Sequence, residues 1–163
     1  MKVLLSVFEC DPQKGSDSYV GWSYVMNAAK KNEIYALTRS DNRSSIEQYC
    51  AENDLVLNNI HFIYVEQSAF FTKTLYKLNR YLGFLGSYFV WQKSAYKKAK
   101  ELHQTVAFDV SHHVTIADFR CAGYLWKLNV PYVFGPIGGG RRHLTVLGNI
   151  QLDMALQRNF VYL

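Results

Sequence analysis

The chain has 163 residues, of which 49% are hydrophobic and 19% are charged. This composition excludes an intrinsically disordered protein, and the length suits one globular domain with a hydrophobic core of its own. The formal net charge of +5 arises from one basic segment rather than from the whole chain, which argues against a protein that coats nucleic acid.

Short apolar runs alternate with segments of helical periodicity along the chain. The runs predict strands over residues 2–8, 33–38, 61–65, 108–112 and 132–134. The helical segments are residues 20–31, 44–53, 73–103 and 118–128. We expect the long third helix to break near Gly83 and Gly86, and Asp118 to cap the fourth. Strands that alternate with helices predict an α/β fold, a Rossmann-like open parallel sheet with helices on both faces.

The cysteines and the first residues bear on the location of the protein. Cys10, Cys50 and Cys121 are widely spaced and form neither a CxxC pair nor a Cys/His metal-binding pattern. We therefore expect three reduced thiols, as in a cytoplasmic protein. The first apolar run is too short for a signal peptide, and no run is long enough to cross a membrane.

The loop after the first strand, residues 9–22, is the first place to look for a ligand. In an open parallel sheet, ligands bind beyond the carboxyl ends of the strands. This loop carries Gly15 and Gly21 but not the GxGxxG spacing of dinucleotide-binding domains. The second strand ends on Thr38 and Arg39 rather than on an acidic residue, so the sequence argues against an NAD(P)-dependent dehydrogenase.

A second glycine cluster follows the fifth strand. Gly135 and Gly140 have the Gly-x4-Gly spacing of a P-loop, but Arg141 replaces its lysine and Arg142 its serine or threonine. Two interpretations stay open. Either the backbone of this loop approaches a phosphate or carboxylate group with two guanidinium groups beside it, or the loop is a tight turn with two ordinary arginines.

His112 and His113 end the fourth predicted strand. Because side chains alternate along a strand, these two lie on opposite faces of the sheet and cannot bind one metal ion together. We expect one of them to pack in the core and the other to point into a cleft. The pattern does not decide which.

The ordered set of these segments resembles the amino-terminal domain of family 4 retaining glycosyltransferases. The resemblance covers nearly the whole chain. It rests on CDPQKGSD (10–17) with VGW (20–22), LTR (37–39), FDVSHHVT (108–115), and WKLNVP (126–131) running into GPIGGG (135–140).

The resemblance implies a GT-B enzyme, in which two Rossmann-like domains face each other across a cleft. Residues 1–163 would form the single acceptor-side domain. The donor-binding carboxyl-terminal domain, absent from this chain, would join it in cis or in trans. Such an enzyme moves a sugar from a nucleotide-sugar, which is a substrate and not a cofactor, to a glycan or lipid-linked acceptor, with retention and without a metal ion. The chain by itself would be inactive.

The resemblance also implies site residues. By position, Gly15 and Ser16 match the family's first glycine loop, which closes over the donor phosphates, and we expect Gly15 to need a positive φ angle. His113, or else His112, matches the region of the catalytic cleft histidine. The triple-glycine loop, expected to contact donor phosphate or acceptor, is matched by Gly138, Gly139, Gly140 and Arg141.

Two alternatives to a truncated enzyme stay open. The chain is then either a natural acceptor-binding subunit of a split glycosyltransferase or a flavodoxin-like, non-enzymatic ligand-binding module.

The basic segment predicts a further partner. Seven of the 18 basic residues lie between Lys73 and Lys100, and no acidic residue lies between Glu66 and Glu101. One apolar stripe of a helix is formed by Leu75, Leu78, Leu82, Leu85 and Phe89. Aromatic residues spread over its other faces, namely Phe70, Phe71, Tyr76, Tyr81, Phe84, Tyr88, Trp91 and Tyr96. We expect residues 70–100 to contact an anionic membrane, which would make the protein peripheral on the inner membrane face. An acceptor groove and a dimer interface are the alternatives, and no nucleic-acid partner is expected.

Overall fold

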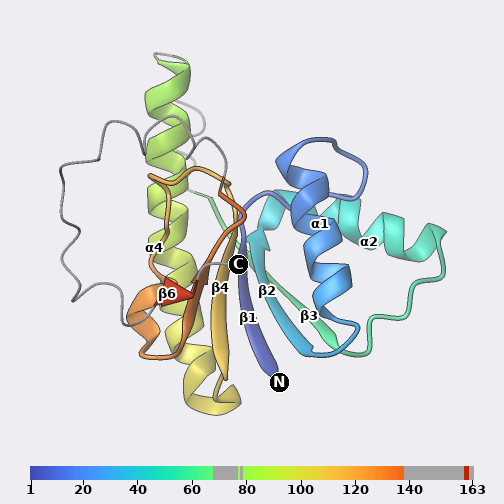
Figure 1. Ribbon diagram of the computed structural model, residues 1–163. Helices are drawn as coiled ribbons and strands as arrows, with labels where there is room; N and C mark the ends of the chain where they lie inside the picture. The colour runs from blue at the N-terminus through green and yellow to red at the C-terminus, as the bar shows by residue number, and fades with distance from the viewer. Residues whose placement is uncertain (68–76, 78, 138–159, 162–163) are drawn as a thin grey trace.

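The computed structural model describes residues 1–67, 77, 79–137 and 160–161 (Figure 1). Within them, a six-stranded sheet has the order β3-β2-β1-β4-β5-β6, and each pair of neighbouring strands is parallel. The strands span Lys2–Val7 (β1), Glu33–Arg39 (β2), Ile60–Val65 (β3), Val110–Thr115 (β4), Tyr132–Phe134 (β5) and Phe160–Val161 (β6). The predicted α/β, Rossmann-like parallel sheet is confirmed.

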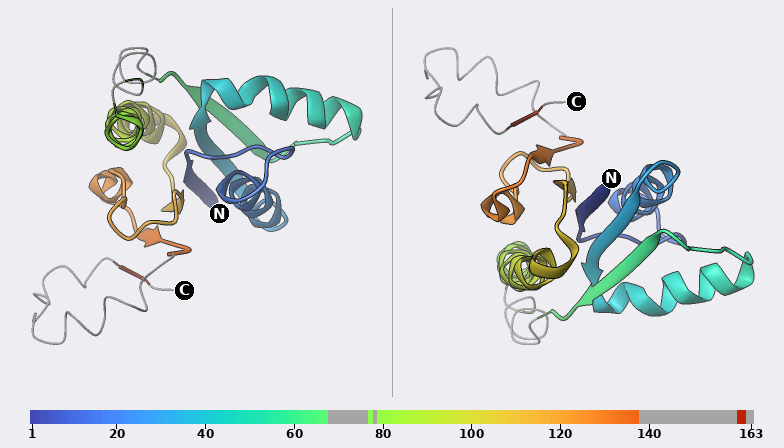
Figure 2. Two further views of the ribbon diagram at one scale, coloured as in Figure 1. Left: turned by 90° about the horizontal axis from the view of Figure 1, so that it is seen from above. Right: turned by 90° about the horizontal axis from the view of Figure 1, so that it is seen from below.

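Helices connect the strands. The α-helices span Asp17–Ala28 (α1), Arg43–Glu52 (α2) and Arg80–Val106 (α4), and two 3-10 helices span Ser40–Asn42 (η1) and Leu125–Leu128 (η3). A core lies on each side of β1, because its side chains alternate. Leu4 packs in one core with Trp91 of α4, and Leu5 packs in the other with Trp22 of α1 and Ile46 of α2. Figure 2 shows α4 and η3 on one side of the sheet and α1 and α2 on the other.

Helix α4 is continuous through Gly83 and Gly86, so the predicted break is wrong. The helix begins at a side-chain cap: the Asn79 Oδ1 accepts hydrogen bonds from the backbone N–H groups of Tyr81 and Leu82, at 3.1 and 3.0 Å. A glycine costs a helix only about 1 kcal/mol, and the packing of the inner face of α4 on the sheet outweighs that cost.

The predicted apolar stripe of this helix faces the core only in part. Leu85 is partly buried and packs against the core. Leu82 and Phe89 are 54% and 39% exposed, and Leu75 and Leu78 lie outside the described residues. The inner face carries Tyr88 and Trp91, both fully buried, so two of the aromatic residues that we assigned to the other faces of the helix belong to the core. Phe70, Phe71 and Tyr76 lie outside the described residues.

The segment after β4 also differs from the prediction. Residues 118–124 form turns and irregular structure, and only Leu125–Leu128 is helical, so the predicted helix over 118–128 is wrong. Gly123 has a φ angle of +65°, which is outside the helical region. Asp118 does not cap a helix, because its carboxylate accepts from the backbone N–H and the guanidinium of Arg120.

Cys10, Cys50 and Cys121 are free thiols, as expected. No helix of the described residues is both long enough and apolar enough to cross a membrane.

Candidate functional site

A pocket of about 400 Å³ opens where β1, β2 and β3 end, beside the first turns of α4. Its walls come from α4 and from residues that end or directly follow three strands, so the pocket lies at the carboxyl edge of the parallel sheet, where ligands of such sheets bind. Its lining residues are Phe8, Glu9, Arg39, Asp41, Gln67, Phe84 and Ser87.

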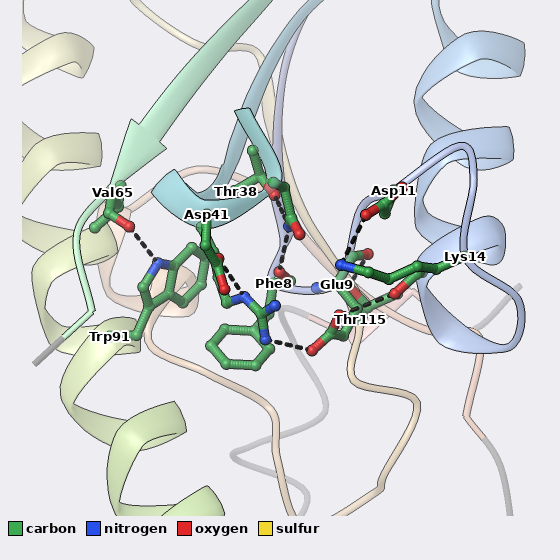
Figure 3. A network of polar contacts seen from close by, with 12 residues as sticks. Phe8, Glu9, Asp11, Lys14, Thr38, Asp41, Val65, Trp91 and Thr115 are labelled. Carbon is green, nitrogen blue, oxygen red and sulfur yellow. Dashed lines mark hydrogen bonds and ion pairs between the residues drawn. The ribbon is translucent and has the colours of Figure 1, made fainter. Parts of the chain in front are cut away.

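Arg39, the last residue of β2, is held on three sides. Its Nη1 donates to Glu9 Oε1 at 2.6 Å and its Nε donates to Asp41 Oδ1 at 2.8 Å. The guanidinium also lies 4.9 Å from the centre of the Phe8 ring. Figure 3 shows Phe8, Glu9 and Asp41 in this network. One cation is thus set against two carboxylates, which leaves this part of the pocket with a net negative charge.

Glu9 lies at the point where the strand order reverses, between β1 and β4. Its backbone N–H donates to Thr115 Oγ1, and the Thr115 hydroxyl lies 3.0 Å from the Glu9 carbonyl oxygen. The hydroxyl of Ser18, in α1, donates to Glu9 Oε2 at 2.9 Å. The position of this carboxylate is therefore fixed from β2, β4 and α1 before any ligand binds.

The loop that follows Glu9 is anchored by the buried carboxylate of Asp11. Burial opposes the ionisation of Asp11, but hydrogen bonds from Lys14, Ser45 and the Gln13 N–H outweigh it and lower the pKa of the carboxyl group. Because Ser45 belongs to α2, Asp11 ties this loop to the neighbouring helix. Figure 3 shows Asp11 paired with Lys14 of the same loop.

Helix α4 forms another wall of the pocket, through Phe84 and Ser87. The Trp91 Nε1 donates to the carbonyl of Val65 at 3.0 Å, which fixes α4 to the end of β3. One turn earlier, Ser87 lines the pocket with only 4% of its surface exposed. Its hydroxyl has no hydrogen-bond partner among the residues that the structure describes. Because a buried hydroxyl without a partner is unfavourable, a polar group of a ligand would stabilise this wall.

The pocket combines acceptors, donors and apolar rings. Carboxylates of Glu9 and Asp41 accept hydrogen bonds, while Gln67 and Ser87 both donate and accept. The ring of Phe84 adds an apolar surface. This set suits a ligand that carries hydroxyl groups beside C–H faces, and its charge disfavours a phosphate.

The two histidines of β4 lie on opposite faces, which confirms the prediction from alternation. His112 lies on the α1 side, where its Nε2 is 2.8 Å from the Gly135 carbonyl and its Nδ1 is 3.0 Å from the Tyr24 hydroxyl. Because a carbonyl only accepts, Nε2 carries the proton and Tyr24 donates to Nδ1. Burial lowers the pKa of His112, against the hydrogen bond to Gly135. The ring lines a second pocket, of about 190 Å³, beside β5.

His113 lies in the core on the α4 side, 1% exposed. Burial lowers the pKa of His113 to about 4, so the ring is neutral at neutral pH. Its Nε2 lies 3.4 Å from both the Tyr88 hydroxyl and the Ile116 carbonyl. It is not among the residues that line either pocket, and its catalytic role stays a prediction.

The glycine-loop residues lie apart from the larger pocket. Gly15 and Ser16 are exposed, and a Cβ built on Gly15 would meet nothing within 4 Å. Ser16, with φ at 58°, takes the positive angle that we expected at Gly15, so that expectation is wrong. Gly138, Gly139, Gly140 and Arg141 lie outside the described residues. In the part of the chain that the structure describes, no three His, Cys, Asp or Glu side chains are grouped so that they could hold a metal ion.

Comparison with protein-family models and with curated proteins finds no match for this chain. The likeness to family 4 glycosyltransferases therefore rests on the sequence motifs, and the activity is a matter for proposal.

Sequence reasoning missed the residues of the larger pocket. It used Arg39 as an argument against a dinucleotide site and as part of the LTR motif, and Asp41 as a residue that caps a helix, but neither as a ligand-binding residue. It passed over Gln67 and Ser87. A usable signal was present, because a charged or amide residue closely follows the end of each of the first three strands. What the sequence did not supply was the order of the strands, which brings these residues together.

Proposed function

We propose that this chain is the acceptor-binding half of a retaining, GT-B type glycosyltransferase, and that a hydroxyl-rich acceptor occupies the 400 Å³ pocket. The observation that carries the proposal is the carboxylate pair of Glu9 and Asp41, fixed by Arg39 at the carboxyl edge of a Rossmann-like sheet. The motif resemblance independently supports the same class of enzyme.

The charge of the pocket favours the acceptor over the donor. A nucleotide-sugar carries a diphosphate, which two carboxylates would repel, whereas sugar hydroxyls donate well to carboxylate oxygens. The donor would then bind to a second domain, in cis or in trans. Glu9, held by Arg39 and Ser18, would orient an acceptor hydroxyl without having to move.

The rim around this edge supports a covering partner. Five of the exposed large hydrophobic residues lie in the first turns of α1 and α4 or follow the ends of β4 and β5. They are Tyr19, Val20, Tyr81, Phe119 and Ile137. An exposed apolar rim around a polar pocket is typical of a surface that another domain covers.

The test is a binding titration of the 163-residue chain with neutral mono- and disaccharides and, separately, with nucleotide-sugars, followed by chemical-shift changes. We expect weak sugar binding, with Kd on the order of 1 mM, and shifts confined to the loops after β1, β2 and β3. Nucleotide-sugars should bind no more tightly than their free sugars.

A matched pair of variants sharpens the test. Asp41→Asn removes the charge of a pocket carboxylate, and we expect affinity to fall about threefold to tenfold. Asp54→Asn makes the same change at an exposed residue outside the pocket, with φ at 49°, which asparagine tolerates. Absence of binding for every sugar, or an equal effect of both variants, would contradict the proposal.

A further inference from the structure

The outer face of α4 combines exposed apolar side chains with cations. Leu82 and Phe89 are exposed. Farther along the same helix, four exposed lysines follow, Lys93, Lys97, Lys98 and Lys100. Among these four lysines, the described residues give an ion pair to Lys98, whose Nζ lies 3.5 Å from Glu101 Oε2. Since both members of that pair are exposed, the pair neutralises little of the positive potential.

Helix η3 extends this face, although it is separated from α4 in the sequence. Its buried Leu125 packs in the same core as Ala95 and Ala99 of α4, and Figure 2 shows η3 beside α4. The outward residues of η3 are Trp126, 51% exposed, and Lys127, whose Nζ lies 5.1 Å from the Trp126 ring.

We propose that this surface, the α4–η3 face, docks on a lipid bilayer that carries anionic headgroups. The α4–η3 face consists of Leu82, Phe89, Lys93, Lys97, Lys100, Trp126 and Lys127. Lysines on one face are attracted to anionic lipid. A tryptophan is stable at the headgroup level, because it combines an apolar ring with a polar N–H group. The N–H of Trp126 donates to the Gly123 carbonyl at 3.2 Å, so this group keeps its hydrogen bond when the ring enters the interfacial layer. The inference goes beyond the proposed function, because it needs neither the pocket nor sugar transfer.

A bilayer fits this face better than a nucleic acid does. The phosphate backbone would satisfy the lysines equally well. It offers nothing to Leu82 or Phe89, however, whereas the interfacial layer of a membrane buries such side chains. The structure also corrects the sequence argument, since Tyr88 and Trp91 are core residues and Trp126, outside the basic segment, takes part.

The experiment is co-sedimentation of the full chain with vesicles of phosphatidylcholine alone and with vesicles that also contain phosphatidylglycerol, at low and at high salt. We expect binding to the anionic vesicles only, weakened by salt. Trp22 and Trp91 are buried, so a blue shift of tryptophan fluorescence on binding should come from Trp126 and disappear in Trp126→Phe.

Two double variants with equal net charge locate the contact. Lys93→Glu with Lys97→Glu should weaken binding to anionic vesicles at least about tenfold, because each lysine near the surface contributes about a fivefold factor. Lys30→Glu with Lys31→Glu, in the turn that follows α1, should leave binding unchanged. Leu82→Ser with Phe89→Ser should weaken binding without changing its salt dependence.

Several results would overturn the inference. These are no binding to anionic vesicles, equal binding to neutral ones, or an equal loss in both lysine variants. If the chain binds duplex DNA through Lys93 and Lys97 but does not bind vesicles, the face belongs to a nucleic-acid partner instead.

Discussion

His112 and His113 are neighbours on β4, yet their rings lie in separate layers of the protein, one beside Tyr24 of α1 and the other beside Tyr88 of α4. No described interaction joins the two rings directly other than a weak electrostatic one, by which His112 lowers the pKa of His113. Substitutions at the two positions should therefore have separate effects.

His113 should make stability depend on pH. Its pKa is about 4 in the folded chain against 6.5 for an ordinary histidine, so the unfolded chain binds the proton more readily between these values. The free energy of unfolding should therefore fall by up to about 3 kcal/mol as pH drops from 6.5 to 4, and be unaffected by His113 above that window. Urea titrations at several pH values, with His113→Gln for comparison, measure this. A ring that titrates near 6.5 by NMR would contradict it.

Gly21 should be intolerant of any side chain. A Cβ there would lie 2.1 Å from the Glu9 carbonyl oxygen and 2.8 Å from Val7 Cγ1. Gly21→Ala should therefore lower the free energy of unfolding by about 3 kcal/mol. Gly15→Ala is the control, because Gly15 has open space around it, and it should change stability by less than about 0.5 kcal/mol. Equal midpoints in urea for both variants would disprove the close approach of α1 to β1.

Arg39 should matter to both stability and binding. Arg39→Met leaves the carboxylates of Glu9 and Asp41 close together without their cation, and we expect a loss of about 1–3 kcal/mol in stability together with loss of sugar binding. Arg43→Met removes an exposed guanidinium from its ion pair with Glu47, which should cost less than about 1 kcal/mol. Thermal unfolding and the sugar titration together distinguish the two variants.

Ser87 and Ser6 form a second comparison. Within the described part of the chain the Ser87 hydroxyl lacks a hydrogen-bond partner, so Ser87→Ala should leave stability within about 0.5 kcal/mol while sugar affinity falls about threefold to tenfold. The Ser6 hydroxyl is bonded to the buried Gln92, so Ser6→Ala should destabilise the chain by about 1 kcal/mol. A Ser87→Ala variant that binds sugar normally would remove Ser87 from the site.

The purified chain should show no glycosyltransferase turnover. Incubation of the purified chain with nucleotide-sugars and with glycan or lipid-linked acceptors should yield no transfer, because the donor would need a second domain. Transfer by these 163 residues alone would contradict the half-enzyme proposal while leaving the pocket and its ligand in place.

The sequence predicted the first five strands but not β6 and not the residues that line the larger pocket. A strand such as β1 is specified locally, by a run of apolar residues. The ion pair between Arg39 and Glu9 depends instead on β2 lying beside β1, with a register that ends both strands at one edge. Neighbouring residues do not encode that register. The error at residues 118–128 has a local cause. Gly123 takes a positive φ angle that interrupts a helix, although the apolar residues around it have helical spacing.

The backbone of Glu9 contacts two elements, because Gly21 of α1 packs against its carbonyl and Thr115 of β4 lies within hydrogen-bonding distance of its N–H and its carbonyl. Thr115 is 106 residues downstream of Glu9. Contacts of such high sequence separation form late, since closing a long loop is entropically unfavourable until other contacts hold its ends. During synthesis, β1, α1 and β2 can therefore assemble while Glu9 still lacks its final orientation. The backbone of Glu9 is fixed from this side only after β4 has emerged from the ribosome and docked against β1, so a chain interrupted before residue 115 would lack this contact even where its first strands had paired.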